Sequence, residues 1–375
     1  MKQTTKIIAI LAVTLAMATP AISAAQATTE KKTEPAEINV IKIPSADSDT
    51  KKTEAAPAKT EAKPVTEPAK ASPAKTKQTT PNKATKVDKA AQTNIKTPKG
   101  QGTILTSEDY FVSVEWLKKN IKSCILIDCR PNSLYKSGHI PGAINAEWTY
   151  FAKVNVPNGT EKWGTILSPE SLSKRISALG INDKKPIVVY CDAKGWGQSG
   201  WALWVLRQAG LKNIYELDGG LSEWKLQGGA VTKTETKAKP VPFKVTNYLP
   251  HFSIDTAALS EKLQDFYIID VRTKAEYDGK IRPFQEKRAG HIPGAINIEK
   301  DNFVDDENLV KSKERIDELL AAVGIGKDKP IVVYDTAGVR SAFVSMILSR
   351  VGYKSINYDP GFQAWAGNPD LPVEK

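Results

Sequence analysis

Short apolar runs alternate with longer amphipathic stretches along the chain from Ile104 onward. The runs are rich in residues that favour strands, and Gly, Pro, Asp or Asn flank them. Residues 169–179 and 199–208, which lie between the runs, have the apolar spacing of helices. This alternation predicts an α/β fold with a mainly parallel sheet and helices on both of its faces. The strands predicted for this first series are 124–128, 186–190 and 214–217.

The same order of runs occurs a second time. Strands predicted at 267–270, 331–334 and 356–358 repeat the first three, and the stretch GHIPGAIN occurs at both 138–145 and 290–297. Trp224 and Trp365 stand near the end of the two series. A chain of 375 residues is also long for one hydrophobic core. We therefore predict two domains of the same fold, at 102–231 and 246–375, joined by a linker at 232–245.

The first 101 residues have a different composition. Residues 1–27 combine Lys2 and Lys6 with an apolar run too short to span a bilayer and small residues up to Ala27, which is typical of a secretory signal peptide. The alternative is a retained membrane anchor. Residues 28–101 are rich in Lys, Pro, Ala and Thr without any aromatic residue, which predicts a disordered tether. We expect a protein exported to the periplasm, cell envelope or exterior, without a transmembrane span when mature. Its basic tether would contact the cell envelope weakly or act only as a spacer.

The formal charge of +11 is concentrated in this N-terminal region. Residues 1–100 contain 17 Lys against 9 acidic residues, a net charge of +8. The remaining residues are nearly neutral and contain no basic stripe interleaved with aromatic residues, so nucleic acid is not an expected partner. We expect neither a metal nor a cofactor.

One of the three cysteines stands in a loop suited to chemistry. Cys191 follows the run at 186–190 and precedes Gly195 and Gly197, and a helix is predicted shortly afterwards. Such a loop can turn backbone N–H groups inward, and the helix N-terminus adds positive potential, so we expect the pKa of this thiol to be lowered. Lys194 adds a mobile cation and Trp196 a wall. The alternative is a small buried cysteine that ends a core strand.

Other polar residues occur in both series. Asp128 and Arg130 match Asp270 and Arg272 at the ends of equivalent strands, and the histidines that begin the equivalent turns are His139 and His291. Because these residues persist in a series that lacks the thiol, we interpret them as structural, as a hydrogen-bonded pair and a turn brace. The alternative is that His139 acts as a general base for Cys191.

The order of these motifs resembles the rhodanese family of sulfurtransferases. The order is Asp-x-Arg, GHIPGAIN, VVYC with a glycine-containing loop, LDGG at 217–220 and Trp224, and the resemblance covers both series from residue 104 onward. It implies that Cys191 attacks the outer sulfur of an anionic donor such as thiosulfate, becomes a persulfide and passes the sulfur to cyanide or a thiol. It also implies that the loop binds the persulfide and donor, through Asp192, Ala193, Lys194, Gly195, Trp196, Gly197 and Gln198.

The chain departs from the family pattern in two ways. The family's compact loop is kept in the second series, from Asp335 to Arg340 and Ser341, but Asp335 replaces the cysteine. The first series has the thiol, in a loop two residues longer and without the arginine, whereas many tandem rhodaneses have the reactive cysteine in the second copy. We therefore expect a degenerate site at Asp335, whose carboxylate would either repel other anions or fold onto Arg340. The second domain would complete the wall of the cleft and stabilise the first domain. A non-catalytic exported binding or sulfur-carrier module is the alternative to an enzyme.

Two further hypotheses concern Cys191. No arginine occurs between Cys191 and Arg207, which disfavours a cysteine phosphatase or arsenate reductase, because those enzymes clamp their oxyanion with an arginine near the thiol. In the rhodanese fold, the strand that ends at Asp128 lies beside the strand that ends at Tyr190. The resemblance therefore allows a disulfide between Cys129 and Cys191 in an oxidising compartment.

Overall fold

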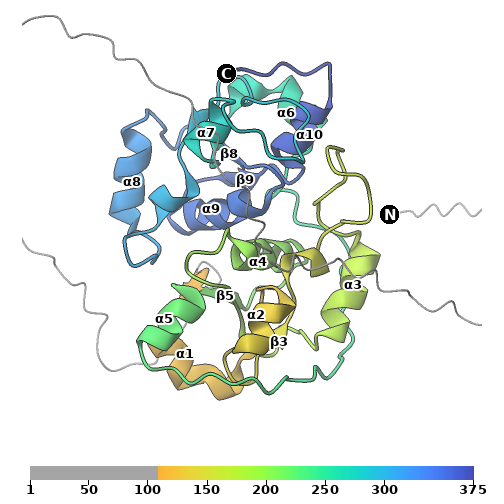
Figure 1. Cartoon of the computed structure of the whole chain (residues 1–375), viewed down its shortest axis with the longest axis vertical. Helices are drawn as coiled ribbons and strands as arrows, with labels where there is room; N and C mark the ends of the chain where they lie inside the picture. The colour runs from red at the N-terminus through yellow and green to blue at the C-terminus, as the bar shows by residue number, and fades with distance from the viewer. Residues whose placement is uncertain (1–108) are drawn as a thin grey trace, which may run out of the picture. The chain divides into compact units, whose positions relative to one another are not determined.

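Two parallel β-sheets form the framework of the protein (Figure 1). The computed structural model describes residues 109–375, and the predicted signal peptide and tether lie outside these residues. The strand order is β1-β5-β4-β2-β3 in the first sheet and β7-β6-β8-β9 in the second, and every strand pair is parallel. The predicted α/β fold, with two copies of a parallel sheet, is confirmed.

The elements follow one another in nearly the same order in the two copies. The first copy contains β1 (Phe111–Val112), α1 (Val114–Asn120), β2 (Ile125–Asp128), α2 (Asn132–Ser137), β3 (Ile144–Asn145), α3 (Pro169–Ala178), β4 (Ile187–Tyr190), α4 (Gln198–Gln208), β5 (Ile214–Leu217) and α5 (Gly220–Leu226). The second contains α6 (Thr256–Glu261), β6 (Tyr267–Asp270), α7 (Lys274–Tyr277), β7 (Ile296–Asn297), α8 (Lys313–Ala321), β8 (Ile331–Tyr334), α9 (Val339–Arg350), β9 (Ser355–Asn357) and α10 (Gly361–Gly367). The 3₁₀ helices are η1 (Ile121–Ser123), η2 (Trp148–Tyr150), η3 (Leu263–Asp265) and η4 (Lys300–Phe303).

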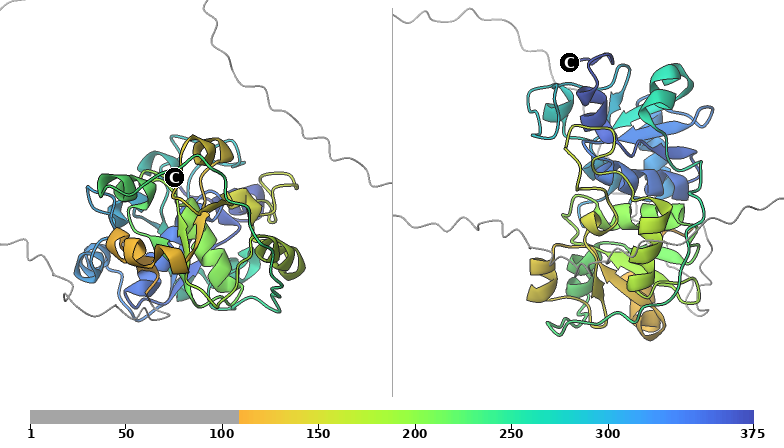
Figure 2. Two further views of the ribbon diagram at one scale, coloured as in Figure 1. Left: turned by 90° about the horizontal axis from the view of Figure 1, so that it is seen from below. Right: turned by 90° about the vertical axis from the view of Figure 1, so that its right-hand side faces the viewer.

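Helices cover both faces of the first sheet (Figure 2). Alternate residues of a strand point to opposite faces, so Val188 packs with α1 and α5, whereas Val189 packs with α3 and α4. The start of α3 shows why this helix begins where it does. The Ser168 hydroxyl caps the helix by accepting a hydrogen bond from a backbone N–H, and Pro169 occupies the first turn.

The longest helices of the two copies, α4 and α9, lie side by side and join the two domains. Their buried residues belong to one continuous apolar cluster that includes strand residues from both sheets. Gly200 permits the close approach, because a Cβ built at this position would lie 2.5 Å from Cα of Phe343. The two domains therefore share a core, and the second domain is fixed close to the carboxyl end of β4.

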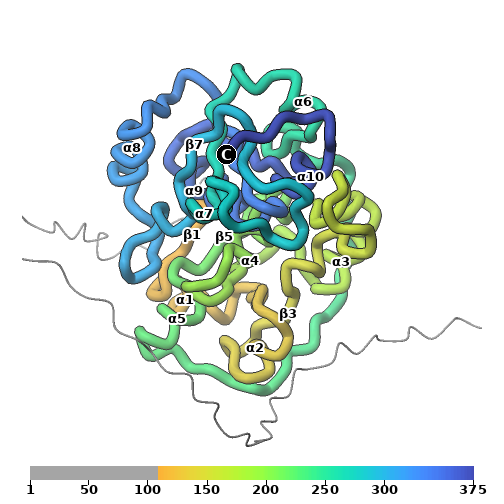
Figure 3. The backbone as a smooth tube through the Cα atoms, turned by 45° about the horizontal axis from the view of Figure 1, so that its top comes forward, coloured from red at the N-terminus to blue at the C-terminus, as the bar shows by residue number. Residues whose placement is uncertain are grey.

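Residues 230–255 connect the two copies without any helix or strand element (Figure 3). The backbone of Thr232 pairs with that of His139, and the N–H of Val241 donates to the carbonyl of Ser177. The connection is therefore bound along the first domain. Within residues 109–375, no helix has the length and apolar character needed to cross a bilayer.

Candidate active site around Cys191

Cys191 stands directly after β4, at the carboxyl edge of the first sheet. Its carbonyl accepts a hydrogen bond of 2.8 Å from the N–H of Leu221, at the start of α5. Gly220 has a positive φ of 57°, and a Cβ at this position would lie 2.1 Å from the Cys191 carbonyl oxygen. A glycine here therefore lets the backbone behind the thiol pack directly against α5.

A small cavity of about 30 Å³ opens beside the thiol, between the two domains. This volume holds one or two water-sized groups, which is sufficient for the extra sulfur of a persulfide. The first domain contributes Cys191, Asp192, Ala193, Gly195, Gly197, Phe111 and residues 216–220. The second domain contributes Lys300, Val304, Asn308 and Phe343. The second domain therefore completes the wall of the cleft, as the sequence predicted.

Three of the predicted loop residues do not line this cavity. Lys194 is exposed, and Trp196 is 44% exposed with its ring edge-on to Trp148 at 5.7 Å. Gln198 is buried, and its Oε1 has no hydrogen-bond partner. The N–H of Gly195 donates to the carbonyl of Asp192 and is not free to bind sulfur. Lys194 and Trp196 are therefore exposed and lie outside the cavity lining.

A buried row of polar groups connects the thiol to a carboxyl group. The Ser199 Oγ lies 2.8 Å from the Cys191 Sγ and 2.5 Å from the Glu216 Oε1. Cys191 is 7% exposed, Ser199 0% and Glu216 5%. The second carboxyl oxygen of Glu216 has no hydrogen-bond partner in this part of the chain. Ser199 and Glu216, the other two members of this row, are therefore shielded from solvent.

The expectation of a lowered thiol pKa was wrong. Burial, together with the nearby Glu216, raises the pKa of Cys191 to about 12, although the side chain and backbone N–H of Ser199 act in the opposite direction. Burial also raises the pKa of Glu216 to about 8, against the hydrogen bond from Ser199 and the charge of Lys300. The helix N-terminus alone does not activate this thiol, because desolvation and a neighbouring acid outweigh it.

Sequence reasoning missed Glu216, Ser199 and Lys300. Glu216 had a signal, since it is a charged residue within an otherwise apolar strand, at 214–217. Lys300 belongs to η4 of the second domain, and its side chain is only 13% exposed. Because a contact between domains has no local pattern in the sequence, Lys300 could be found only from the structure.

The residues interpreted as structural lie at the base of the site. The Arg130 guanidinium donates to both Asp128 oxygens and to the Gly138 carbonyl, and its other nitrogen is 3.6 Å from Asp192. The two ring nitrogens of His139 lie within 3.0 Å of the carbonyls of residues 135 and 234. The His139 ring therefore braces the turn and the interdomain connection, and no hydrogen bond joins it to Cys191 in residues 109–375.

The second copy fills the equivalent position with ion pairs. Asp335 accepts hydrogen bonds from the Arg340 side chain at 3.1 Å and from the hydroxyl of Ser341 at 3.0 Å. Arg340 also binds Glu276. The predicted contact of Asp335 with Arg340 is therefore present, and the carboxylate occupies the place of a thiol.

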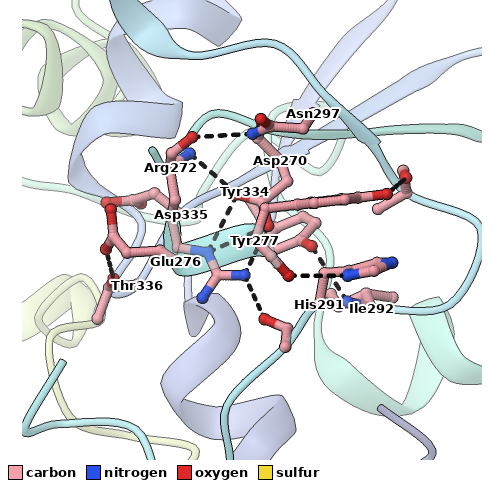
Figure 4. A network of polar contacts seen from close by, with 12 residues as sticks. Asp270, Arg272, Glu276, Tyr277, His291, Ile292, Asn297, Tyr334, Asp335 and Thr336 are labelled. Carbon is pink, nitrogen blue, oxygen red and sulfur yellow. Dashed lines mark hydrogen bonds and ion pairs between the residues drawn. The ribbon is translucent and has the colours of Figure 1, made fainter. Parts of the chain in front are cut away.

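Beside this group, the buried Arg272 binds Asp270 (Figure 4). Arg272 also binds Glu286 and donates to the Gly290 carbonyl. His291 stacks on Tyr277, with ring centroids 3.7 Å apart, and its Nδ1 lies 3.0 Å from the Tyr277 carbonyl. The Asp270, Arg272 and His291 arrangement repeats that of the first copy, which is what a scaffold shared by both domains requires.

All three cysteines are free thiols in the structure. Cys129 follows β2, and its N–H donates to the carbonyl of Tyr190, so the chain positions of Cys129 and Cys191 are adjacent. The disulfide that the resemblance allows is not formed here. Among residues 109–375, no group of three or more His, Cys, Asp or Glu side chains is arranged to hold a metal ion.

Comparison with known proteins gives one consistent family. The model of the rhodanese-like domain matches residues 113–227 and again residues 255–368. The 3-mercaptopyruvate sulfurtransferase of Escherichia coli is 30% identical over 72% of this chain and 99% of its own length. The mitochondrial thiosulfate/3-mercaptopyruvate sulfurtransferase 1 of Arabidopsis thaliana is 29% identical over 76% of this chain and 83% of its own.

Two further similarities are to a sulfur carrier protein and to a solved structure. The sulfur carrier protein TtuD of Thermus thermophilus is 28% identical over 71% of this chain and 97% of its own length. The structure of a single-substitution variant of EanB in complex with ergothioneine has a TM-score of 0.65 at 24% identity, over 71% of this chain and 70% of that one, which shows a shared fold. The two family matches, the paired parallel sheets and the relatives of nearly equal length agree. This chain belongs to the rhodanese family, as a tandem-domain sulfurtransferase.

Proposed function

We propose that the protein transfers sulfane sulfur from thiosulfate or a similar anionic donor to cyanide or a thiol, through a persulfide on Cys191. The observation that carries this proposal is the position of Cys191, the one thiol that borders the cavity between the domains. Relatives named for thiosulfate and 3-mercaptopyruvate support the class of donor.

The proposed chemistry has two steps. The Cys191 sulfur attacks the outer sulfur of the donor, and sulfite or pyruvate leaves according to the donor used. The outer sulfur of the persulfide is then attacked by the acceptor, which restores the thiol. The backbone N–H of Ser199, in the first turn of α4, faces the sulfur and is placed to stabilise negative charge in both steps.

The second domain contributes to binding rather than to sulfur transfer. Asp335 cannot form a persulfide, and its carboxylate is occupied by Arg340 and Ser341. Lys300 is the basic residue among those that line the cavity. We therefore assign the attraction of an anionic donor to Lys300, and not to the outward Lys194.

The test uses the protein without its first 27 residues, incubated with thiosulfate and cyanide while thiocyanate is followed. Wild type should produce thiocyanate and, with donor alone, gain the mass of one sulfur on the peptide that contains Cys191. Cys191→Ser should lose both properties, whereas Cys124→Ser, a change at the opposite end of the first sheet, should retain both. If wild type gains no sulfur from either thiosulfate or 3-mercaptopyruvate, the proposal is wrong.

The same experiment separates the enzyme from a sulfur carrier, the second candidate, which the similarity to TtuD supports. A carrier would gain one sulfur on Cys191 but release it only to a specific protein, so thiocyanate would not accumulate. Loading without turnover would therefore favour the carrier.

We also propose that the protein is exported. The support is the composition of residues 1–27, with two lysines, an apolar run and small residues. Expression of the full chain and N-terminal sequencing of the mature form should find cleavage close to Ala27 in the exported fraction. An uncleaved protein in the cytoplasmic fraction would contradict export.

A further inference from the structure

Ser199 lies between two groups that can exchange a proton, the Cys191 thiol and the Glu216 carboxyl group. Ser199 has a single hydroxyl proton, yet its Oγ lies 2.8 Å from Cys191 Sγ and 2.5 Å from Glu216 Oε1. If the hydroxyl donates to the nearer carboxylate, a lone pair of the same oxygen is left to accept the thiol proton. The three groups then form one line of hydrogen bonds from sulfur to carboxylate.

The second copy provides an internal comparison for this row. Ser341 matches Ser199, and its Oγ lies 3.0 Å from Asp335 Oδ1 and 2.6 Å from Asn357 Oδ1. The serine and its geometry are thus kept in both copies. The copy with a thiol ends the row in Glu216, and the copy without a thiol ends it in an amide, which cannot accept a proton at neutral pH.

Burial gives a reason why the thiol needs a local proton acceptor. Cys191, Ser199 and Glu216 are all at least nine-tenths buried, and a free thiolate beside an ionised carboxylate in this environment would place two negative charges together. Moving the proton from one group to the other keeps the total at a single charge. The unpartnered Oε2 of Glu216 faces no competing hydrogen-bond donor in the described residues.

We propose that Glu216 is the general base of the sulfurtransferase reaction and removes the thiol proton of Cys191 through the hydroxyl of Ser199. This inference rests on the proposed function, because it takes Cys191 as the nucleophile. Ser199 acts as a positioning residue and proton relay between them.

The step balances in atoms and charge with thiosulfate as donor. The thiol proton passes to the Ser199 oxygen while the Ser199 proton passes to the Glu216 carboxylate. The sulfur electron pair of Cys191 forms a bond to the outer sulfur of thiosulfate, and the S–S bond of the donor breaks with its electron pair on the departing sulfite dianion. One negative charge stays on the persulfide. When the acceptor removes the outer sulfur, the Cys191 thiolate recovers its proton from Glu216 by the same path.

Glu216→Gln tests the proposal because it keeps the size of the side chain while removing the base. The measurement is the single-turnover rate of persulfide formation from thiosulfate between pH 6 and 10, followed by mass. In wild type the rate should rise as Glu216 ionises and then level off. In Glu216→Gln this rise should be absent, and the rate at pH 8 should fall by about 10²-fold, the usual contribution of a general base.

Ser199→Ala is the second variant, since it breaks the relay and leaves the carboxyl group in place. Ser199→Ala should also lose the rise in rate that accompanies ionisation of Glu216. If Glu216→Gln fails to fold, Ser199→Ala alone tests the relay. A purely electrostatic role for Glu216 predicts the opposite result, because removal of a negative neighbour would favour the thiolate and make Glu216→Gln faster. A faster variant, or an unchanged pH profile in either variant, would overturn the relay. If wild type forms no persulfide at all, the proposed role of Cys191 as the nucleophile is wrong instead.

Discussion

Replacement of Gly220 by alanine tests whether the backbone behind Cys191 must pack directly on α5. Gly220 has φ +57°, a conformation that costs an alanine about 1–2 kcal/mol. The added Cβ would also lie 2.1 Å from the Cys191 carbonyl oxygen, about 1 Å closer than a real Cβ approaches such an atom. Overpacking of this kind costs typically about 1–3 kcal/mol, so we expect Gly220→Ala to lose about 2–5 kcal/mol of unfolding free energy.

The second copy supplies a matched control. Gly361 stands at the equivalent position with φ +68°, and its added Cβ would lie 2.5 Å from the Thr336 carbonyl oxygen. Gly361→Ala should therefore lose stability by a similar amount, through the same backbone strain and the same kind of contact. It does not touch the Cys191 loop.

The two variants should differ in activity. Relief of the contact at Gly220 requires the Cys191 backbone to move by about 1 Å, and a displacement of that size can cost about 10²-fold in rate. Urea unfolding gives the folded fraction of each variant, and thiocyanate production is then compared per folded molecule. Gly361→Ala should remain within about threefold of wild type. If Gly220→Ala is as active per folded molecule as Gly361→Ala, the packing at Gly220 does not position the thiol.

Three further predictions follow from buried charges. Arg272→Met leaves two buried carboxylates without their cation and should lower the unfolding free energy in urea by about 3–5 kcal/mol; a loss under about 1 kcal/mol would contradict this. Burial raises the pKa of Glu216 to about 8 and that of Asp359 to about 7, so between pH 4.5 and 8 the folded protein binds more protons than the unfolded chain. Stability should fall as pH rises through this range, with a higher melting temperature at pH 5.5 than at pH 8, and an equal or lower value at pH 5.5 would refute the assignment. Lys300→Ala should raise the KM for thiosulfate by about tenfold, the loss of one charge-assisted contact, while Lys194→Ala changes it by less than about twofold; equal effects would remove Lys300 from the site.

The sequence predicted the fold well because the relevant signals are local and occur twice. The strands at 214–217, 267–270 and 331–334 have the predicted bounds, whereas β9 begins and ends one residue earlier than expected. Apolar runs between glycines and polar residues define a buried parallel strand wherever they occur. Because the same order of runs occurs twice in the sequence, two sheets could be predicted without knowledge of any contact.

The site was less predictable because its properties depend on contacts between distant residues. The position of Cys191 could be inferred from a strand followed by a glycine-containing loop, but its raised pKa depends on burial and on Glu216, 25 residues later in the chain. The sequence also offered no reason to separate the residues of the loop at 192–198, all of which were expected to bind the donor, yet Lys194 and Trp196 lie outside the cavity lining. The cation that lines the cavity in place of Lys194 is Lys300, which belongs to the second domain.

The absence of a thiol from the second copy is consistent with the way the two domains hold each other. Asp218 accepts a hydrogen bond of 2.9 Å from the N–H of Val310 in the second domain, and Asp359, at the equivalent position, accepts one of 3.1 Å from the N–H of Ile166 in the first. Each copy therefore fixes a loop of its neighbour by the same device, which needs no thiol. The loop fixed by Asp218 follows the segment that carries Lys300 and Val304 to the cavity. A second copy with Asp335 in place of cysteine can thus keep its whole contribution to the Cys191 site, since that contribution is made by its surface loop and not by its own catalytic position.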